Sequence, residues 1–415
     1  MTRNLCEDLL AIWQAGVDGV DVRRLVGEAM AIERDGLVPP AQQLVIGDAF
    51  YPLADIKRIS VIGAGKATAG MAAAVELVLA EQIDAGIVAG WVNIPDGCQA
   101  CLAGPLCCLA GVPAVRSASD AASLRVIRQH VARPAGVNEP TEAGVFGTQQ
   151  MLALIDATNR ELSQQGIPLA QHLVLCLMSG GGSALMPLPA PGVTLEQKLA
   201  VTRFLSASGA TINEINTVRK QLSGVKGGGL KEFCRGTKLV GLILSDVLGD
   251  PLDIIASGPT VDNETTAPDA VHVLDKYGFA HSAQYAELAR NILDRLQETA
   301  AGNAVSETNG VTGSGGSVRN LVIGNNATAV DAAGLEAVKR GYSPTMLCAT
   351  QSEGDVETLA DHFVDLIQST TRKLVAHLAL AYASCSESPR RNARQGFRRR
   401  LPIALHTTLW ANSRV

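Results

Sequence analysis

Three short apolar segments, each running into a glycine- or aspartate-rich turn, constrain the fold of this chain most strongly. The segments cover residues 58–62, 172–177 and 238–244 and are rich in Val, Ile and Leu. Stretches that favour helix, about 67–80 and 149–165, lie along the chain between them. Strands that alternate with helices predict an α/β protein with a Rossmann-like, mostly parallel sheet. Functional groups of such a sheet gather at the carboxyl ends of its strands, where all three turns are expected to lie.

Two triple-glycine loops point to an anionic ligand. The second segment runs into Ser179, three glycines and Ser183, and a second triple glycine begins at Gly227. Glycine loses much backbone entropy on folding, so clustered glycines usually serve a purpose. In many proteins they let the backbone approach an anion closely and bind it through N–H groups. The polar residues near both loops suit a phosphorylated or carboxylated ligand. The candidate binding residues are Ser179, Gly180, Gly181, Gly182, Ser183, Asn216, Arg219, Lys220, Lys226, Gly227 and Gly228.

The turn after the first strand, Gly63-Ala64-Gly65-Lys66, matches neither of two well-known phosphate-binding motifs. A dinucleotide fingerprint requires a third glycine where this chain has Thr68, and no acid is expected at the end of a second strand over 86–92. A Walker A loop requires a different glycine spacing and Ser or Thr after the lysine. What remains is a strand–glycine–lysine–helix unit. Lys66 is either a solvated surface lysine or, as we favour, a cation that meets an anion, with Gly63 and Gly65 beside it.

Carboxylates concentrate after the third strand. Asp246 and Asp250 follow the segment 238–244 directly. Mg²⁺ prefers one or two carboxylates together with water and phosphate oxygens, so this pair could hold it. One of the two could instead orient a substrate hydroxyl. Helix capping and turn formation are the alternative without a function.

Composition narrows the class of protein. The net charge of −5 argues against a nucleic-acid partner, and the longest apolar runs fall short of the ~18 residues that span a bilayer. The amino-terminal residues lack the pattern of a signal peptide, and an odd number of cysteines, nine, favours a reducing cytoplasm over a disulfide scaffold. Cys98 and Cys101 have the spacing of a first pair of zinc ligands, but the adjacent Cys107 and Cys108 do not have the spacing of a second pair. A small-residue loop is the simpler interpretation.

The length of 415 residues predicts two domains. We place an N-terminal Rossmann-like domain at 1–265, a connecting segment with a polar loop at 266–317, and a smaller α/β domain at 318–415. Residues 132–148, rich in Pro, Gly and Thr, read as a loop. A further strand over 319–324 ends at Asn325, another candidate binding residue.

Five motifs occur in the order and spacing of one family. They are GAGKA at 63–67, SGGGSAL at 179–185, NxxRKxxSxxKGG at 216–228, SDVxGD at 245–250 and ASGPT at 256–260. On these motifs the chain resembles the glycerate 2-kinases of the two-domain bacterial type, which carry a so-called MOFRL C-terminal domain. Some members of that family bear the name hydroxypyruvate reductase.

The resemblance implies phosphorylation of D-glycerate at its 2-hydroxyl by Mg-ATP in a cleft between two domains. The family's essential lysine falls on Lys66. We expect Asp246 to act near the metal or the attacking hydroxyl, and the glycine loops to cradle phosphates or the glycerate carboxylate. Glycerate and ATP are the expected partners, with no nucleic acid or membrane, and the chain could form a homodimer. An NAD(P)H-dependent hydroxypyruvate reductase and a degenerate, non-catalytic nucleotide-binding protein stay open as alternatives.

The chain departs from the family in two places. Residues 111–123 lack a His-Pro-x-Pro-Asp-like segment, and after about residue 355 the family's Gly-Gly-Arg-Asn-Gln-Glu and Thr-Asp-Gly motifs are missing. Residues 390–400 instead hold six arginines. This tail is an anion-binding arm, a divergent domain, or out-of-frame coding sequence, and we favour the last. Without the catalytic arginine of the missing motif, we expect phosphoryl transfer to be impaired.

Overall fold

The computed structural model describes residues 4–34, 42–99, 124–282, 284–300 and 316–348, parts of 357–369, and the backbone of 402–406. These residues fall into two compact units. The large unit comprises residues 22–324, and the small unit combines residues up to 21 with those from 325 onward. Each unit is described by itself.

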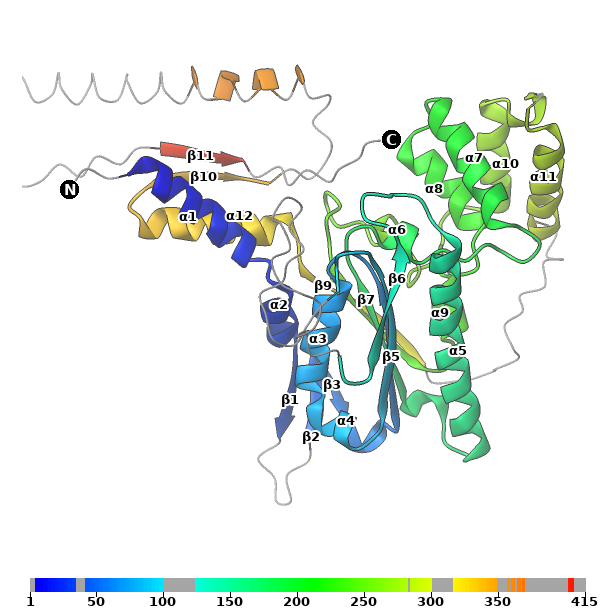
Figure 1. Ribbon diagram of the computed structural model, residues 1–415, viewed down its shortest axis with the longest axis horizontal. Helices are drawn as coiled ribbons and strands as arrows, with labels where there is room; N and C mark the ends of the chain where they lie inside the picture. Colours follow the sequence, from blue (N-terminus) through cyan, green and yellow to red (C-terminus); the bar gives the residue numbers. More distant parts are fainter. Residues whose placement is uncertain are drawn as a thin grey trace, which may run out of the picture. The chain divides into compact units, whose positions relative to one another are not determined.

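A six-stranded parallel sheet with the strand order β6-β5-β4-β7-β8-β9 forms the centre of the large unit (Figure 1). The three segments that constrained the fold are neighbours in it, as β4, β7 and β8, and the α/β class is confirmed. The strands are β4 (Arg58–Ala64), β5 (Val88–Pro95), β6 (Ile127–Arg133), β7 (His172–Met178), β8 (Lys238–Leu244) and β9 (Ser317–Gly324).

Both faces of this sheet are covered, which explains why its central strands are apolar at most positions. Strand β7 is buried throughout. Leu175 and Leu177 belong to the core on one face, whereas Cys176 and Met178 belong to the core on the other. This alternation is the two-residue period of a strand that lies between two layers.

Helices supply the two layers. Helix α3 (Thr68–Val78) packs on one face through its small residues. Helix α5 (Glu142–Gln164) packs on the other face through Met151 and Ile155. The prediction of a loop over residues 132–148 was wrong for the second half of that range, which belongs to α5. Thr141 caps a helix there by accepting a hydrogen bond from the N–H of Gly144, and small residues let that helix approach β5 closely.

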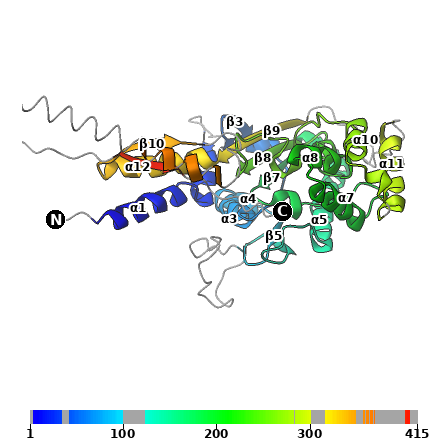
Figure 2. The same cartoon turned by 90° about the horizontal axis from the view of Figure 1, so that it is seen from above.

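A separate group of helices, α7, α8, α10 and α11, lies at one end of the sheet in both views (Figures 1 and 2). These helices share their own core, with Leu205, Leu274 and Phe279 fully buried. Their bounds are α7 (Leu195–Ala207), α8 (Ile212–Gln221), α10 (Ala267–Lys276) and α11 (Ala286–Ala300).

The remaining elements of the large unit are short. An antiparallel sheet of three strands precedes β4. These elements are α2 (Val22–Ala29), β1 (Met30–Arg34), β2 (Gln42–Ile46), β3 (Ala49–Pro52), α4 (Ala80–Asp84), α6 (Gly182–Leu185) and α9 (Gly229–Phe233). Four single 3-10 turns complete them, at Leu53–Asp55, Leu169–Gln171, Ile255–Ser257 and Phe279–His281.

The small unit packs α1 (Leu5–Asp18) against α12 (Asn326–Lys339). The buried Asp8 accepts hydrogen bonds from Arg340 and from the Tyr342 hydroxyl, both at 2.7 Å. Strand β10 (Ser343–Leu347) pairs in parallel with β11 (Pro402–His406). Helix α1 therefore packs with α12, although more than 300 residues separate the two helices in the sequence.

The strand that we placed at the start of the C-terminal domain lies in the large sheet, since β9 pairs with β8. The three-domain division itself stays a prediction. Residues 111–123 and most of the arginine-rich tail lie outside the described residues. Within the described part of the chain, no helix is both long enough and apolar enough to cross a membrane.

Candidate active site

The register of the sheet brings the three predicted turns to one edge. Ala64 pairs with Met178, and Met178 pairs with Ile243. The turns that follow β4, β7 and β8 therefore begin side by side at the carboxyl ends of adjacent strands. This is the position at which parallel sheets place their ligands.

Hydrogen bonds join the first two turns. The N–H of Lys66 donates to the carbonyl of Gly180 at 2.9 Å, and the N–H of Ala67 donates to Ser179 Oγ at 3.0 Å. The N–H of Ser179 donates in return to the carbonyl of Ala64 at 3.3 Å. We call these three bonds the clasp. They hold the backbone of Lys66 against the first glycine loop.

Charged side chains flank the peptide groups of Gly180 and Gly181. A Cβ at Gly180 would lie 2.5 Å from Asp246 Oδ2, so the carboxylate touches the loop directly. A Cβ at Gly181, where φ is +80°, would lie 3.1 Å from Arg133 Nη2 and 3.7 Å from Lys66 Cε. Within the described residues the N–H groups of Gly180 and Gly181 donate to no acceptor. Two cations, one carboxylate and two free N–H groups thus surround one turn.

Partial desolvation raises the pKa of Asp246 above its ordinary value, although the residue as a whole is exposed. A hydrogen bond from its own backbone and the positive charge of Lys66 oppose the rise. Asp250 lies four residues further along the same turn, with a strained φ of 54°. No group of three or more His, Cys, Asp or Glu side chains that could hold a metal ion occurs among the described residues. Of the predicted cysteine cluster, only Cys98 is described.

A second cationic cluster surrounds Ser183, two residues beyond Gly181. Arg219 Nη2 donates to Ser183 Oγ at 2.8 Å, and Lys226 Nζ donates to the same oxygen at 2.7 Å and to the Ser183 carbonyl at 2.6 Å. Ser257 Oγ lies 2.9 Å from Ser183 Oγ, and its hydroxyl donates to Asn216 Oδ1 at 3.4 Å. We call these residues the Ser183 cluster. The predicted residues Asn216, Arg219 and Lys226 therefore do come together.

Lys198 of α7 is a further cation of this neighbourhood that sequence reasoning missed. Desolvation by burial, together with the charge of Arg219, lowers its pKa to about 7. Burial, Arg219 and Lys198 lower the pKa of Lys226 well below its ordinary value, and burial lowers that of Arg219. Within the described residues no carboxylate forms an ion pair with any of the three. Buried cations that lack a counter-ion are costly, so the arrangement favours an anionic ligand.

The other predicted cation lies elsewhere. Lys220 is buried and pairs with Asp253 at 3.2 Å, so its charge already has a partner. It lines a pocket of about 640 Å³ together with Lys226 and the second glycine loop.

The second triple-glycine loop does not offer the N–H groups that we expected. The N–H of Gly227 donates to the carbonyl of Ser257 at 3.0 Å, and that of Gly228 donates to the carbonyl of Gly258 at 2.7 Å. A Cβ at Gly228 would lie 2.8 Å from the carbonyl oxygen of Val261. These glycines allow two loops to pack closely, which positions Lys226. A cradle formed by the N–H groups of Gly227 and Gly228 is not supported.

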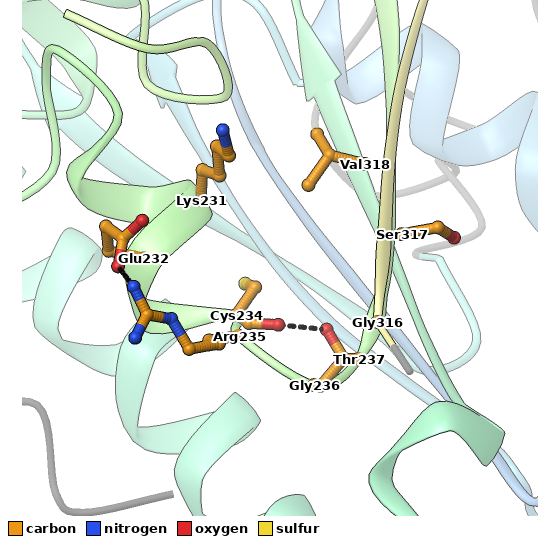
Figure 3. A pocket seen from close by; sticks show the side chains of 9 residues that line it. All are labelled: Lys231, Glu232, Cys234, Arg235, Gly236, Thr237, Gly316, Ser317 and Val318. Atoms are coloured by element: carbon orange, nitrogen blue, oxygen red, sulfur yellow. Dashed lines mark hydrogen bonds and ion pairs between the residues drawn. The ribbon is translucent and has the colours of Figure 1, made fainter. Parts of the chain in front are cut away.

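A smaller pocket, of about 190 Å³, lies at the amino ends of β8 and β9, near Thr237 and Ser317 (Figure 3). An ion pair joins Arg235 to Glu232, and Thr237 Oγ1 donates to the carbonyl of Cys234 at 2.8 Å. Because this pocket lies at the opposite ends of the strands from the clasp, we do not assign it to the site.

The structure bears on two expectations about single residues: Asp96 overturns one of them, and the binding role of Asn325 stays a prediction. β5 runs to Pro95, so Asp96 does follow the second strand, where we expected no acid. Its carboxylate accepts hydrogen bonds from Gly97 N and Gln99 Nε2, in a local turn. Asn325, a predicted binding residue, lies in the small unit, where its side chain caps α12 by accepting from Thr328 N at 3.1 Å.

The family described as "Domain of unknown function (DUF4147)" matches residues 8–294. The chain belongs to this family. A glycerate kinase of Mus musculus is 33% identical over 384 residues, which are 91% of this chain and 63% of that protein. A relative from Agrobacterium vitis with a hydroxypyruvate reductase name is 34% identical over 318 residues, 76% of this chain and 68% of its own.

A solved structure of a glycerate kinase from Thermotoga maritima matches with a TM-score of 0.55 and 30% identity. The match covers 82% of this chain and 63% of that one. These relatives confirm the resemblance to the glycerate 2-kinase family. The chain spans about 63% of the length of the mammalian relatives that it matches.

The clasp predicts a steep steric cost at Gly65. A Cβ there would lie 2.0 Å from Ser179 Oγ, and φ is +153°. We expect Gly65→Ala to lower the free energy of unfolding by about 3 kcal/mol or more, measured by urea denaturation. Gly86→Ala is the matched control, because Gly86 has a φ of +71° but no atom within 4 Å of the added carbon. It should cost only about 1 kcal/mol. Equal losses in the two variants would contradict the clasp.

The lowered pKa of Lys198 predicts a dependence of stability on pH. Between about 7, its pKa in the folded protein, and its ordinary 10.5, the unfolded chain binds a proton that the folded chain does not. The free energy of unfolding of the wild type should therefore rise relative to Lys198→Met, by about 1 kcal/mol per pH unit in that window. Below pH 7 the difference should level off. Lys57→Met, at an exposed lysine, is the control. A difference between wild type and Lys198→Met that is independent of pH would show that Lys198 is not buried as described.

Proposed function

We propose that this protein transfers the γ-phosphoryl group of Mg-ATP to the 2-hydroxyl of D-glycerate, giving 2-phosphoglycerate and ADP. The observation that carries the proposal is the set of buried, uncompensated cations on both sides of the loop 179–183. Both substrates are anions, and their carboxylate and phosphoryl oxygens supply the missing counter-charge. The glycerate kinase names of relatives support the choice of substrate.

The geometry suggests how the two anionic groups are divided. The phosphoryl group belongs at Gly180 and Gly181, because two free N–H groups, Lys66 and a carboxylate suited to a metal ion lie there. The glycerate carboxylate then belongs at the Ser183 cluster, where Arg219, Lys226 and Lys198 lie without a carboxylate partner among the described residues, and where a bound anion would favour the charged forms of the two lysines. The two places lie on the same loop, with Ser183 two residues beyond Gly181.

In this arrangement the C2 oxygen of glycerate forms a bond to the γ-phosphorus while the bond from that phosphorus to the bridging oxygen of ADP breaks. The hydroxyl proton passes to Asp246 or to water. A raised pKa makes Asp246 a better proton acceptor than an ordinary carboxylate. Lys66 and the N–H groups of the loop stabilise the charge on the phosphoryl oxygens. Such chemistry depends on positioning and electrostatics.

The donor set of this turn fits Mg²⁺ that arrives with ATP. Asp246 and Asp250 would hold the ion, because one or two carboxylates are enough when phosphate oxygens and water complete its coordination. The bound ion would neutralise charge on the phosphates. A homodimer and a cytoplasmic location are part of the proposal.

A hydroxypyruvate reductase is the second candidate, favoured by the name of the Agrobacterium vitis relative and by Asp96 at the end of β5. The turn after β4 speaks against it. Where the dinucleotide fingerprint has a third glycine, Thr68 is buried and bonds Ser179 Oγ at 3.2 Å. Oxidation of NADH with hydroxypyruvate as the substrate would favour this candidate.

The kinase proposal predicts that Lys66→Ala lowers kcat at least about 100-fold, because one cation of the phosphoryl site is lost. The measurement is coupled release of ADP with D-glycerate and Mg-ATP. Lys57→Ala, which removes an exposed lysine at the opposite end of β4, should retain wild-type turnover. Wild-type turnover in Lys66→Ala would contradict the assignment of Lys66. ATP binding without any turnover in the wild type would favour the degenerate, non-catalytic alternative.

A further inference from the structure

Arg133 is a buried cation that the proposed reaction has not yet used. It is the last residue of β6, at the carboxyl edge of the sheet, and only 4% of its surface is exposed. Its Nε is buried and has no hydrogen-bond partner among the described residues. One long bond, 3.5 Å from Nη1 to Asn138 Oδ1, is its sole side-chain bond to a described residue.

The contrast with Arg58 shows how unusual this is. Arg58, on β4 of the same sheet, forms an ion pair with Glu161. Arg133 has no carboxylate partner in the described part of the chain, and desolvation lowers its pKa. Among the described residues, Cys98 is the one group whose charge acts against this shift. A guanidinium stays charged in a protein nonetheless, so the charge is held inside without a carboxylate to compensate it. Burial of that kind is costly unless a ligand supplies the opposite charge.

The guanidinium lies at the first glycine loop. The ideal Cβ position of Gly181 is 3.1 Å from Arg133 Nη2 and 3.7 Å from Lys66 Cε, so both cations flank the same peptide. The N–H groups of Gly180 and Gly181 are free there, as described above. The guanidinium of Arg133, the ammonium of Lys66 and the two N–H groups supply several donors, which match the several oxygens of a phosphoryl group.

We propose that Arg133 binds the phosphoryl oxygens at the Gly180–Gly181 turn, opposite Lys66, as a further anion-binding residue of the site. This deepens the proposed function and rests on it for the identity of the phosphoryl donor. The binding of a polyphosphate at this turn does not depend on any reaction. The two claims can therefore be tested apart.

The first experiment measures binding of inorganic tripolyphosphate to the full chain by calorimetry, without nucleotide or metal. Arg133→Met should weaken binding at least about 10-fold, since a charged bidentate contact is lost. The affinity of Arg133→Lys for tripolyphosphate should lie between those of Arg133→Met and the wild type, because lysine keeps the charge but not the planar guanidinium. Arg128→Met, on the same strand at an exposed position, should bind like the wild type.

The second experiment asks whether added guanidinium ions restore ADP release in Arg133→Ala. A residue that binds the phosphoryl group should be rescued in kcat, whereas a residue with only a packing role should not. If Arg133→Met does not fold, Arg133→Lys decides the question through its affinity for tripolyphosphate and its kcat.

The outcomes separate the two claims. Loss of tripolyphosphate binding in the Arg133 variants, in a protein with no glycerate turnover, would support Arg133 and overturn the kinase. Wild-type affinity in both Arg133→Met and Arg133→Lys would overturn the role of Arg133, even if the wild type is an active kinase. A wild type that does not bind tripolyphosphate would overturn it too.

Discussion

The clasp between the turns after β4 and β7 is the constraint on which the site depends. Three hydrogen bonds join residues 64–67 to Ser179 and Gly180, and Gly65 allows the approach because it has no side chain. The clasp orients the first glycine loop so that Lys66, Asp246 and Arg133 meet it. The parallel register beneath makes the clasp possible, since it ends β4 and β7 at the same level.

Charge that is buried without compensation distinguishes this edge of the molecule. Two cations elsewhere in the large unit do have carboxylate partners, since Arg58 pairs with Glu161 and Lys220 pairs with Asp253. At the Ser183 cluster and beside Gly181 they do not. Backbone strain lies in the same region, because Asp250, Ala256 and Ser257 all have positive φ. Both kinds of cost are typical of a site that a ligand completes.

The sequence alone predicted the parts that follow from local patterns. The strands β4, β7 and β8 were evident because buried parallel strands form nearly continuous apolar runs, and the turns after them carried the glycine and aspartate residues. Sequence patterns did not show Lys198 or Arg133, since each is one cation in an ordinary helix or strand and only the tertiary fold buries it. The second glycine loop was misjudged for a related reason. A triple glycine indicates close approach, but whether to a ligand or to another loop depends on residues 257–261, which are distant in sequence.

The most direct test of this account is a crystal structure of the full chain with ADP, Mg²⁺, aluminium fluoride as a phosphoryl mimic, and D-glycerate. The account predicts that the fluoride atoms accept from the N–H groups of Gly180 and Gly181, with the glycerate carboxylate at the Ser183 cluster. Binding of the nucleotide phosphates in the pocket beside Lys220 and the second glycine loop, with the Gly180–Gly181 turn empty, would contradict it.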